Sequence, residues 1–302
     1  MNFFSPKFHV HGWRGMIPRK AYGSIHSWRF RGARRLRLLL GLEPADPELL
    51  VSTLVCRFTS PGSVFIDVGA QRGRHVKALF ENPVGDVRAV AVEANPDLAA
   101  ELATAFSSEI SANRLLVVHA AAGEEGGTAV FHVNLRDSGY SGLQRRNLPE
   151  CGPDYETREI GMVTIDQLAA ESERTVSCIK IDVEGAEWGV LRGAVKTLES
   201  HCPVVLFECA NNAAPFYGYG LKELVEWFNQ RGYLVSTIAG QEVQIHSADA
   251  LFKSGICHDF LAFSKDGSTR AFVESRNAAN SLLGMKFDLE AKTSPSGLHR
   301  HD

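Results

Sequence analysis

Residues 64–73 read VFIDVGAQRG, a short apolar run that ends in Asp67 and passes into a turn containing Gly69 and Gly73. Such a run is typical of a buried β-strand that enters a helix through a tight turn. Glycine has no Cβ, so the main chain can bend sharply there and a ligand can lie against it. The stretch therefore predicts a strand, a turn shaped for a ligand, and a helix.

Short β-branched runs recur along the chain and alternate with segments of helical periodicity, which predicts a mostly parallel α/β sheet with helices on both faces. Apolar spacing predicts three of these helices, around residues 98–106, 191–198 and 221–228. The predicted strands are Val64–Asp67, Val87–Val92, Leu115–His119, Val176–Asp182, Pro203–Glu208, Tyr233–Ile238 and Phe260–Ser264.

An insertion interrupts this alternation after the third strand. It contains two further predicted strands, Thr128–Val133 and Glu159–Val163, which enclose the polar loop Asp137–Tyr155. Loops of this length inside a compact domain are usually functional or disordered. We interpret this one as a lid that carries contacts to a substrate.

The composition divides the chain into three regions, a basic N-terminal extension at 1–59, a catalytic domain at 60–265 and a polar tail at 266–302. Residues 1–50 hold nine basic and three acidic side chains, and a short basic helix is predicted at Trp28–Leu40. This helix either packs on the domain edge with a solvated positive face or contacts an anionic surface such as membrane lipid.

Bulk properties narrow the class of protein. The net charge of −3 and the isoelectric point near 6.4 give no sign of nucleic-acid binding. The six cysteines form no CxxC pair, which favours free thiols in a reducing compartment and disfavours a metal site. The apolar runs are too short to span a membrane and no signal peptide is evident, so a cytoplasmic protein is expected. The oligomeric state leaves no readable pattern.

Acidic side chains stand at the carboxyl ends of three predicted strands: Asp67, Glu93, and Asp182 with Glu184 two residues on. These ends share one edge of a parallel sheet, which is where ligands bind. Glu93 is placed to accept hydrogen bonds from both ribose hydroxyls of a nucleoside. Asp67 suits a cationic or hydroxyl-bearing group better than a pyrophosphate. The structural alternatives are a turn capped by Asp67 and a helix capped by Glu184 or Glu187.

Five segments together resemble the FkbM family of methyltransferases. They are VFIDVGA at 64–70, EANP at 93–96, VTID at 163–166, IKIDVEGAE at 179–187 and PVVLFE at 203–208. The fourth is the most specific. The resemblance implies a Rossmann-like, seven-stranded sheet, mostly parallel with an antiparallel last strand. It also implies S-adenosylmethionine as methyl donor and an acceptor hydroxyl on a sugar, a glycolipid or another small-molecule natural product.

The resemblance also assigns a donor site by position. The turn after the first strand would shape the pocket for the donor's methionine part, the end of the second strand would hold the ribose, and the end of the third would flank the adenine. The residues implied are Asp67, Gly69, Ala70, Gly73, Glu93, Ala94, His119, Ala120 and Asp182.

Methyl transfer from a sulfonium depends mainly on alignment, which can supply roughly 7–11 kcal/mol of the barrier. A hydroxyl acceptor must also lose its proton, so a general base or a metal is needed at the carboxyl edge of the sheet. Asp182 is the first candidate for the base and Glu208 the second. Either could instead help hold Mg²⁺, but two separate carboxylates are weak evidence for a metal site.

Two other readings stay open. A nicotinamide-dependent oxidoreductase is disfavoured because the fingerprint G-x-G-x-x-G is incomplete and Asp67 would repel a pyrophosphate. A catalytically inactive binding module of the same fold is the other, because fold alone does not prove activity. Gln71 and His75 support it, since the family commonly has Asn and an aromatic residue at these positions.

Overall fold

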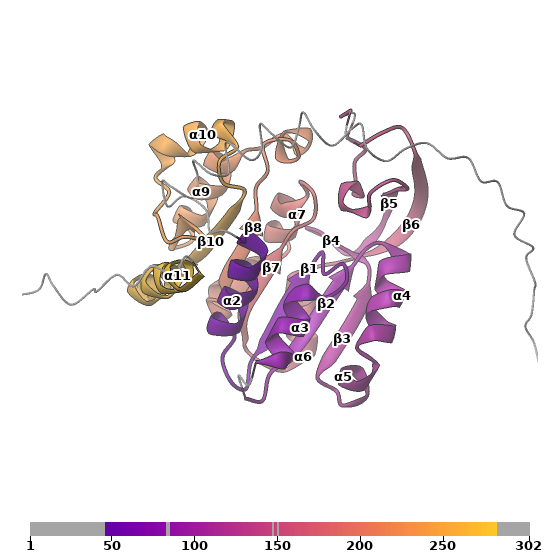
Figure 1. Cartoon of the computed structure of the whole chain (residues 1–302), viewed down its shortest axis with the longest axis horizontal. Helices are drawn as coiled ribbons and strands as arrows, with labels where there is room; N and C mark the ends of the chain where they lie inside the picture. Colours follow the sequence, from indigo (N-terminus) through magenta and orange to yellow (C-terminus); the bar gives the residue numbers. More distant parts are fainter. Residues whose placement is uncertain (1–45, 83–84, 147, 150, 283–302) are drawn as a thin grey trace, which may run out of the picture.

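The computed structural model describes residues 46–82, 85–146, 148–149 and 151–282. Its centre is a seven-stranded sheet in the order β3-β2-β1-β7-β8-β10-β9 (Figure 1). Only β10 runs antiparallel to its neighbours, β8 and β9, which confirms the predicted mostly parallel sheet with an antiparallel last strand. The strands are β1 (Val64–Val68), β2 (Arg88–Glu93), β3 (Leu115–His119), β7 (Val176–Ile181), β8 (Val204–Glu208), β9 (Tyr233–Thr237) and β10 (Asp259–Ser264).

Helices cover both faces of this sheet (Figure 1). The apolar residues of each strand alternate between the two layers: Ile66 and Val68 pack on one face, and Phe65 packs on the other. The first layer contains α6 (Ile165–Ser172), α7 (Glu187–Arg192), α8 (Val195–His201), α9 (Leu221–Gln230) and α10 (Ile245–Ser254). The second contains α2 (Pro47–Phe58), α3 (Arg74–Glu81), α4 (Pro96–Ala105), which continues into α5 (Ser107–Ser111), and α11 (Ser268–Leu282).

Two helices outside residues 60–265 contribute to the second layer. In α2, Leu50 and Leu54 are fully buried because their i, i+4 spacing places them on one side of the helix. In α11, Ala271 and Ala278 are buried in the same cluster. The packed core therefore reaches past both ends of the domain drawn from the sequence. The predicted helix Trp28–Leu40 lies outside the described residues.

The helix predicted around residues 191–198 is two helices, α7 and α8. They separate at Gly193, where a Cβ would lie 2.0 Å from the carbonyl oxygen of Gly123. Asp166 then supplies the N-terminal hydrogen bonds of α8, because its Oδ1 accepts the amide hydrogen of Thr197 at 2.8 Å. The break follows from contacts with residues that are distant in sequence, which local periodicity does not report.

The insertion forms a second, three-stranded sheet in the order β4-β6-β5. It consists of β4 (Ala121–Ala122), β5 (Gly127–Asn134) and β6 (Tyr155–Val163), and it stands beyond the carboxyl end of the large sheet (Figure 1). Both predicted strands of the insertion are confirmed. We call the connection between β5 and β6 the lid loop, of which the structure describes residues 135–146, 148–149 and 151–154. It is fastened by Asn134, whose side chain donates to the carbonyl of Cys151 at 2.7 Å and accepts from the amide of Arg136 at 2.9 Å.

All six cysteines are free thiols, as the sequence predicted, and four of them are buried. Burial raises the pKa of Cys56, which lies on α2. No helix in the described part of the chain is long and apolar enough to cross a membrane.

Candidate active site

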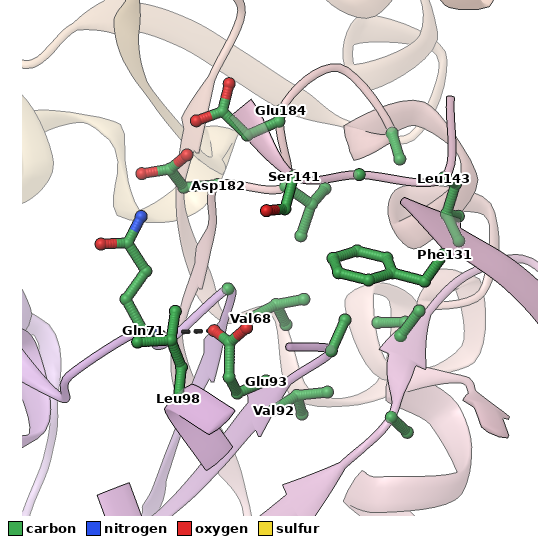
Figure 2. A pocket seen from close by; sticks show the side chains of 18 of the residues that line it. Val68, Gln71, Val92, Glu93, Leu98, Phe131, Ser141, Leu143, Asp182 and Glu184 are labelled. Atoms are coloured by element: carbon green, nitrogen blue, oxygen red, sulfur yellow. Dashed lines mark hydrogen bonds between the residues drawn. The ribbon is translucent and has the colours of Figure 1, made fainter. Parts of the chain in front are cut away.

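The carboxyl ends of β1, β2 and β7 border a cleft with about 560 Å³ of open space, part of it continuous with solvent. Figure 2 shows Gln71, Asp182 and Glu184 at one end of the cleft and Phe131 and Leu143 at the other. The cleft therefore has a polar end and an apolar end.

The structure brings together only part of the residue set predicted from the sequence. Those that line the cleft are Gly69, Glu93, Ala94, Ala120 and Asp182. Those that lie outside its lining are Asp67, Ala70, Gly73, His119 and Glu208.

The glycines of the first turn serve close packing of the main chain. At Gly69, where φ is +77°, a Cβ would lie 1.8 Å from the carbonyl oxygen of Asp182, so glycine lets β1 and the loop after β7 meet. At Gly73 a Cβ would lie 2.5 Å from the Leu102 side chain, so this glycine lets α3 approach α4. Gly69 thus places Asp182 at the cleft, whereas Gly73 acts through helix packing.

Glu93 connects the cleft floor to the turn above it. Its Oε2 accepts the amide hydrogen of Gln71 at 2.7 Å (Figure 2). Its Oε1 accepts that of Asn95 at 2.8 Å. Burial raises the pKa of Glu93, and these backbone hydrogen bonds oppose the rise. A carboxylate has about four acceptor positions. Glu93 can therefore hold the turn and still accept hydrogen bonds from a ligand.

Small and apolar residues form the other end of the cleft. Ala120 follows β3 and leads into Ala121 and Ala122 of β4, while Phe131 of β5 and Leu143 of the lid loop close the opposite side. These side chains offer flat apolar contacts suited to an aromatic ring. The side chain of His119, by contrast, is exposed at the edge strand.

Asp182 lies at the polar end of the cleft. Its Oδ2 accepts a hydrogen bond from Nζ of Lys180 at 3.1 Å. The Asp182 side chain remains 29% exposed, so part of the carboxylate is open to the cleft. A carboxylate anchored on one oxygen and open on the other can accept a proton from a ligand that lies in the cleft.

Glu184 joins the same end of the cleft to the lid loop. Its Oε2 pairs with the guanidinium of Arg146 at 2.6 Å, and the Arg146 side chain is only 2% exposed. Burial raises the pKa of Glu184 to about 7, even though Arg146 acts to lower it. Glu184 has a φ of +58°, a left-handed conformation that is uncommon for residues other than glycine. The ion pair holds the lid loop against β7.

Glu187, three residues further on, organises the loop rather than the ligand. Its Oε1 accepts the amide hydrogens of Val183 and Gly185 at 3.1 and 3.0 Å, and its Oε2 accepts from the hydroxyl of Tyr219. Glu187 is 1% exposed, and burial raises its pKa while Tyr219 lowers it. Neither Glu184 nor Glu187 caps α7, and Glu187 instead fixes the loop that precedes this helix.

Asp67 and Glu208 occupy different places from the one the sequence suggested. Asp67 is fully buried beneath the cleft floor, and neither of its oxygens has a hydrogen-bond partner. Burial raises the pKa of Asp67 to about 6. Glu208 lines a separate, small hollow that shares Asp182 with the cleft. Burial, reinforced by Asp182 and Glu184, raises the pKa of Glu208 well above its usual value, so it keeps its proton to higher pH than an ordinary glutamate.

A metal site finds no support at this edge of the sheet. Within the described ranges, no group of three or more histidine, cysteine, aspartate or glutamate side chains is arranged to hold a metal ion. Mg²⁺ binding usually requires a set of oxygen ligands in near-octahedral geometry.

The cleft does fit a nucleoside that carries a charged chain. An aromatic base matches the apolar end, and Glu93 lies where ribose hydroxyls would follow. Asp182 and the turn at Gly69 stand at the end that suits a cationic group. The residues present agree with the donor that the resemblance implied.

Sequence reasoning missed three kinds of contributors. Arg146 and Phe131 come from the insertion, whose side chains have no periodic pattern that places them at the cleft. Ser141 lines the cleft and its Oγ accepts the amide hydrogen of Asn134 at 3.0 Å. Lys180 gave a usable signal, because a lysine inside a buried central strand is unusual.

Comparison with known proteins adds a family to this geometry. The sequence profile of the methyltransferase FkbM domain matches residues 67–235, which is more than half of the chain. The matched segment begins at Asp67 on β1 and ends within β9, so it contains the cleft and its insertion. No curated protein matches the sequence significantly.

Among solved structures, methyltransferase FkbM from Methylobacillus flagellatus KT is 16% identical, with a TM-score of 0.42 over 78% of this chain and 59% of that one. The chain thus spans less than two thirds of that protein's length. The cofactor-bound protein Rv0187 from MTB is 13% identical, with a TM-score of 0.42 over 82% of this chain and 93% of that one. A SAM-dependent O-methyltransferase from Thermotoga maritima is 13% identical, with a TM-score of 0.37 over 71% and 64%.

Proposed function

Because the chain belongs to the FkbM methyltransferase family, we propose that it transfers a methyl group from S-adenosylmethionine to a hydroxyl group of a small polar acceptor, such as a sugar or a glycolipid. One observation carries this proposal. An apolar slot, the Glu93 carboxylate and the Asp182 carboxylate follow one another along a single cleft at the carboxyl edge of the sheet (Figure 2). This order matches a base, a ribose and a sulfonium.

Each part of the cleft would hold one part of the donor. Ala120, Phe131 and Leu143 would enclose the adenine, and Glu93 would accept the ribose hydroxyls. The turn at Gly69 would receive the methionine end. The bound donor supplies a methyl group on a positively charged sulfur, which is an excellent leaving group. The chain therefore has to align the acceptor and manage one proton.

Asp182 is the group best placed to manage that proton. Its carboxylate is fixed through Oδ2 by Lys180 and opens into the cleft on its other side. As the bond between the acceptor oxygen and the methyl carbon forms, Asp182 takes the hydroxyl proton, and S-adenosylhomocysteine is left as the second product. Glu208 is less well placed to accept that proton, because it lies outside the lining of the cleft.

The lid loop supplies the remaining requirement, which is exclusion of water. Ser141 and Leu143 of the loop line the cleft directly. The pair between Arg146 and Glu184 holds the loop on β7, and Tyr217 adds a hydrogen bond by accepting the amide hydrogen of Gln144 at 3.1 Å. A loop tied at both places can cover an acceptor during transfer.

Calorimetric titration with S-adenosylhomocysteine and, separately, with NADH tests the class of cofactor. We expect saturable binding of S-adenosylhomocysteine and none of NADH. Binding of NADH alone would indicate an oxidoreductase. Binding of neither would indicate a module that keeps the fold without the activity.

A methyl-transfer screen with labelled donor tests the acceptor. The panel should contain sugars and glycolipid precursors, together with matched amines and thiols of similar size. We expect label on oxygen in at least one polyhydroxylated acceptor. Label found only on nitrogen, sulfur or carbon would refute hydroxyl specificity while leaving methyl transfer intact.

A further inference from the structure

A buried lysine lies in the central strand of the sheet. Lys180 is flanked in β7 by Ile179 and Ile181, and it is only 7% exposed. A lysine is almost never buried without a partner, because removing an ammonium from water is costly. Lys180 lies two residues before Asp182, so its charge can act on the carboxylate proposed as the general base.

Lys180 stands between two carboxylates. Its Nζ donates to Oδ2 of Asp182 at 3.1 Å. In the register of β1 with β7 it lies opposite Asp67, on the same face of the sheet. Asp67 is fully buried, and neither of its oxygens has a hydrogen-bond partner. The single ammonium therefore serves both carboxylates, by contact with one and at longer range with the other.

Charge balance in this cluster is consistent with a permanently charged lysine. Burial acts to lower the pKa of Lys180, but Asp182 and Asp67 more than offset it and the net shift is upward. Lys180 in turn is the main influence that limits the rise of the Asp67 pKa, which burial causes. The ammonium therefore keeps its proton to higher pH than an ordinary lysine.

We propose that Lys180 is a positioning residue for methyl transfer, because its hydrogen bond to Oδ2 aims the Asp182 carboxylate into the cleft while Asp67 supplies the counter-charge that retains the ammonium inside the sheet. The inference rests on the proposed function, in which Asp182 accepts the acceptor's proton. Lys180 does not line the cleft, so it acts on the reaction only through Asp182.

Other titratable groups lie around the cluster formed by Lys180, Asp67 and Asp182, on the neighbouring elements α2, α3, β2 and β8. Glu48 of α2 lies 3.8 Å from Nε2 of His75, and His75 on α3 is held through Nδ1 by Ser52 at 2.9 Å. Burial lowers the pKa of His75 to about 3, so this ring is neutral at physiological pH. Glu93 stands on the β2 side and Glu208 on the β8 side. Arg74 of α3 lies 3.9 Å from Glu48 and is exposed, whereas Lys180 is the buried cation that faces Asp67 and Asp182.

The test compares Lys180→Met, the double variant Lys180→Met/Asp67→Asn, and the control Lys222→Met. Methionine keeps the length of lysine without its charge. The control removes an exposed lysine on α9 that pairs with Glu226 at 4.0 Å. Lys180→Met leaves Asp67 buried without a cation, so its stability will fall. The double variant removes both charges, so it should regain much of that stability.

Turnover is measured with labelled donor and an acceptor that the screen identifies. We expect kcat to fall at least tenfold in both Lys180 variants, with KM for the donor and the Kd for S-adenosylhomocysteine within threefold of wild type. The control should match wild type. A folded double variant with turnover within threefold of wild type would show that Lys180 matters only for stability and would overturn the inference.

A second readout needs no acceptor. In a ¹³C-carboxyl NMR titration of aspartate-labelled protein, the signal that Asp67→Asn abolishes should titrate near pH 6 and move upward by more than one pH unit in Lys180→Met. If the Asp67 signal titrates at the same pH in Lys180→Met as in wild type, the inference that Lys180 acts on both carboxylates is refuted. Absence of methyl transfer by the wild-type chain would refute the proposed function, whereas normal transfer by the folded double variant refutes only the role of Lys180.

Discussion

Replacing Glu93 with glutamine removes one charge and one acceptor from the floor of the cleft. The wild-type carboxylate accepts the amide hydrogens of Gln71 and Asn95 at 2.7 and 2.8 Å. In Glu93→Gln one of these positions becomes an NH₂ group that faces an N–H donor. A hydrogen bond to a charged group contributes about 1.5–3 kcal/mol. Because the substitution also relieves the burial of a carboxylate, we expect the free energy of unfolding to fall by about 2 kcal/mol.

Donor binding should weaken as well. The ribose would lose one of its charged hydrogen bonds, and a loss of about 2 kcal/mol corresponds to a Kd raised about 30-fold. Calorimetry with S-adenosylhomocysteine measures the affinity, and urea denaturation measures the stability. Glu81→Gln is the matched control, since this glutamate is 64% exposed on α3 and pairs with the exposed Lys77 at 3.6 Å. A folded Glu93→Gln that binds S-adenosylhomocysteine as tightly as wild type would refute the reasoning.

Three further substitutions probe the frame around the cleft. In urea denaturation, Gly69→Ala should destabilise the chain by several times the roughly 1–2 kcal/mol that a left-handed conformation costs. The control Gly62→Ala should show only that cost, because φ there is +78° and no atom lies within 4 Å of the new Cβ. Arg146→Met should lower the free energy of unfolding by somewhat less than the roughly 3–5 kcal/mol that breaking a fully buried pair costs, because its partner Glu184 is 24% exposed. A change no larger than that of Arg158→Met, which breaks an exposed pair, would contradict this. Asp67 has a pKa near 6, above its unfolded value, so wild type binds more protons when folded and loses stability as pH rises from about 4 to 6. Asp67→Asn should remove that loss, about 3 kcal/mol at 1.36 kcal/mol per unit, and equal pH dependence in urea denaturation of the two proteins would exclude it.

Much of the fold follows from local pattern. The strands of the large sheet end within one residue of their predicted limits, because buried runs such as Val64–Val68 are bounded by polar or glycine-containing turns. The acids at strand ends were located by the same reasoning. Glu93 and Asp182 reach the cleft because parallel strands bring their carboxyl ends to one edge.

The rest depends on contacts that no local pattern records. Asp67 lies near the end of β1, just before the turn at Gly69. The alternation of side chains along β1 nevertheless directs Asp67 beneath the cleft floor, opposite Lys180. Arg146 is separated by 38 residues from its partner Glu184, and only the folded lid loop brings them together. The break between α7 and α8 likewise requires Asp166 and Gly123, which lie far from it in sequence. An acidic residue at the end of a strand can therefore be predicted to lie near the site. The direction in which its side chain points cannot be predicted in this way.

The small β4-β6-β5 sheet has a kinetic consequence. Ala121 and Ala122 form the wall beside the adenine slot, and β5 and β6 carry both ends of the lid loop. One rigid unit thus borders the entrance for the donor and the cover over the acceptor. If this unit shifts outward to admit a ligand, both chambers open in the same movement. Binding of either ligand would then alter access to the other.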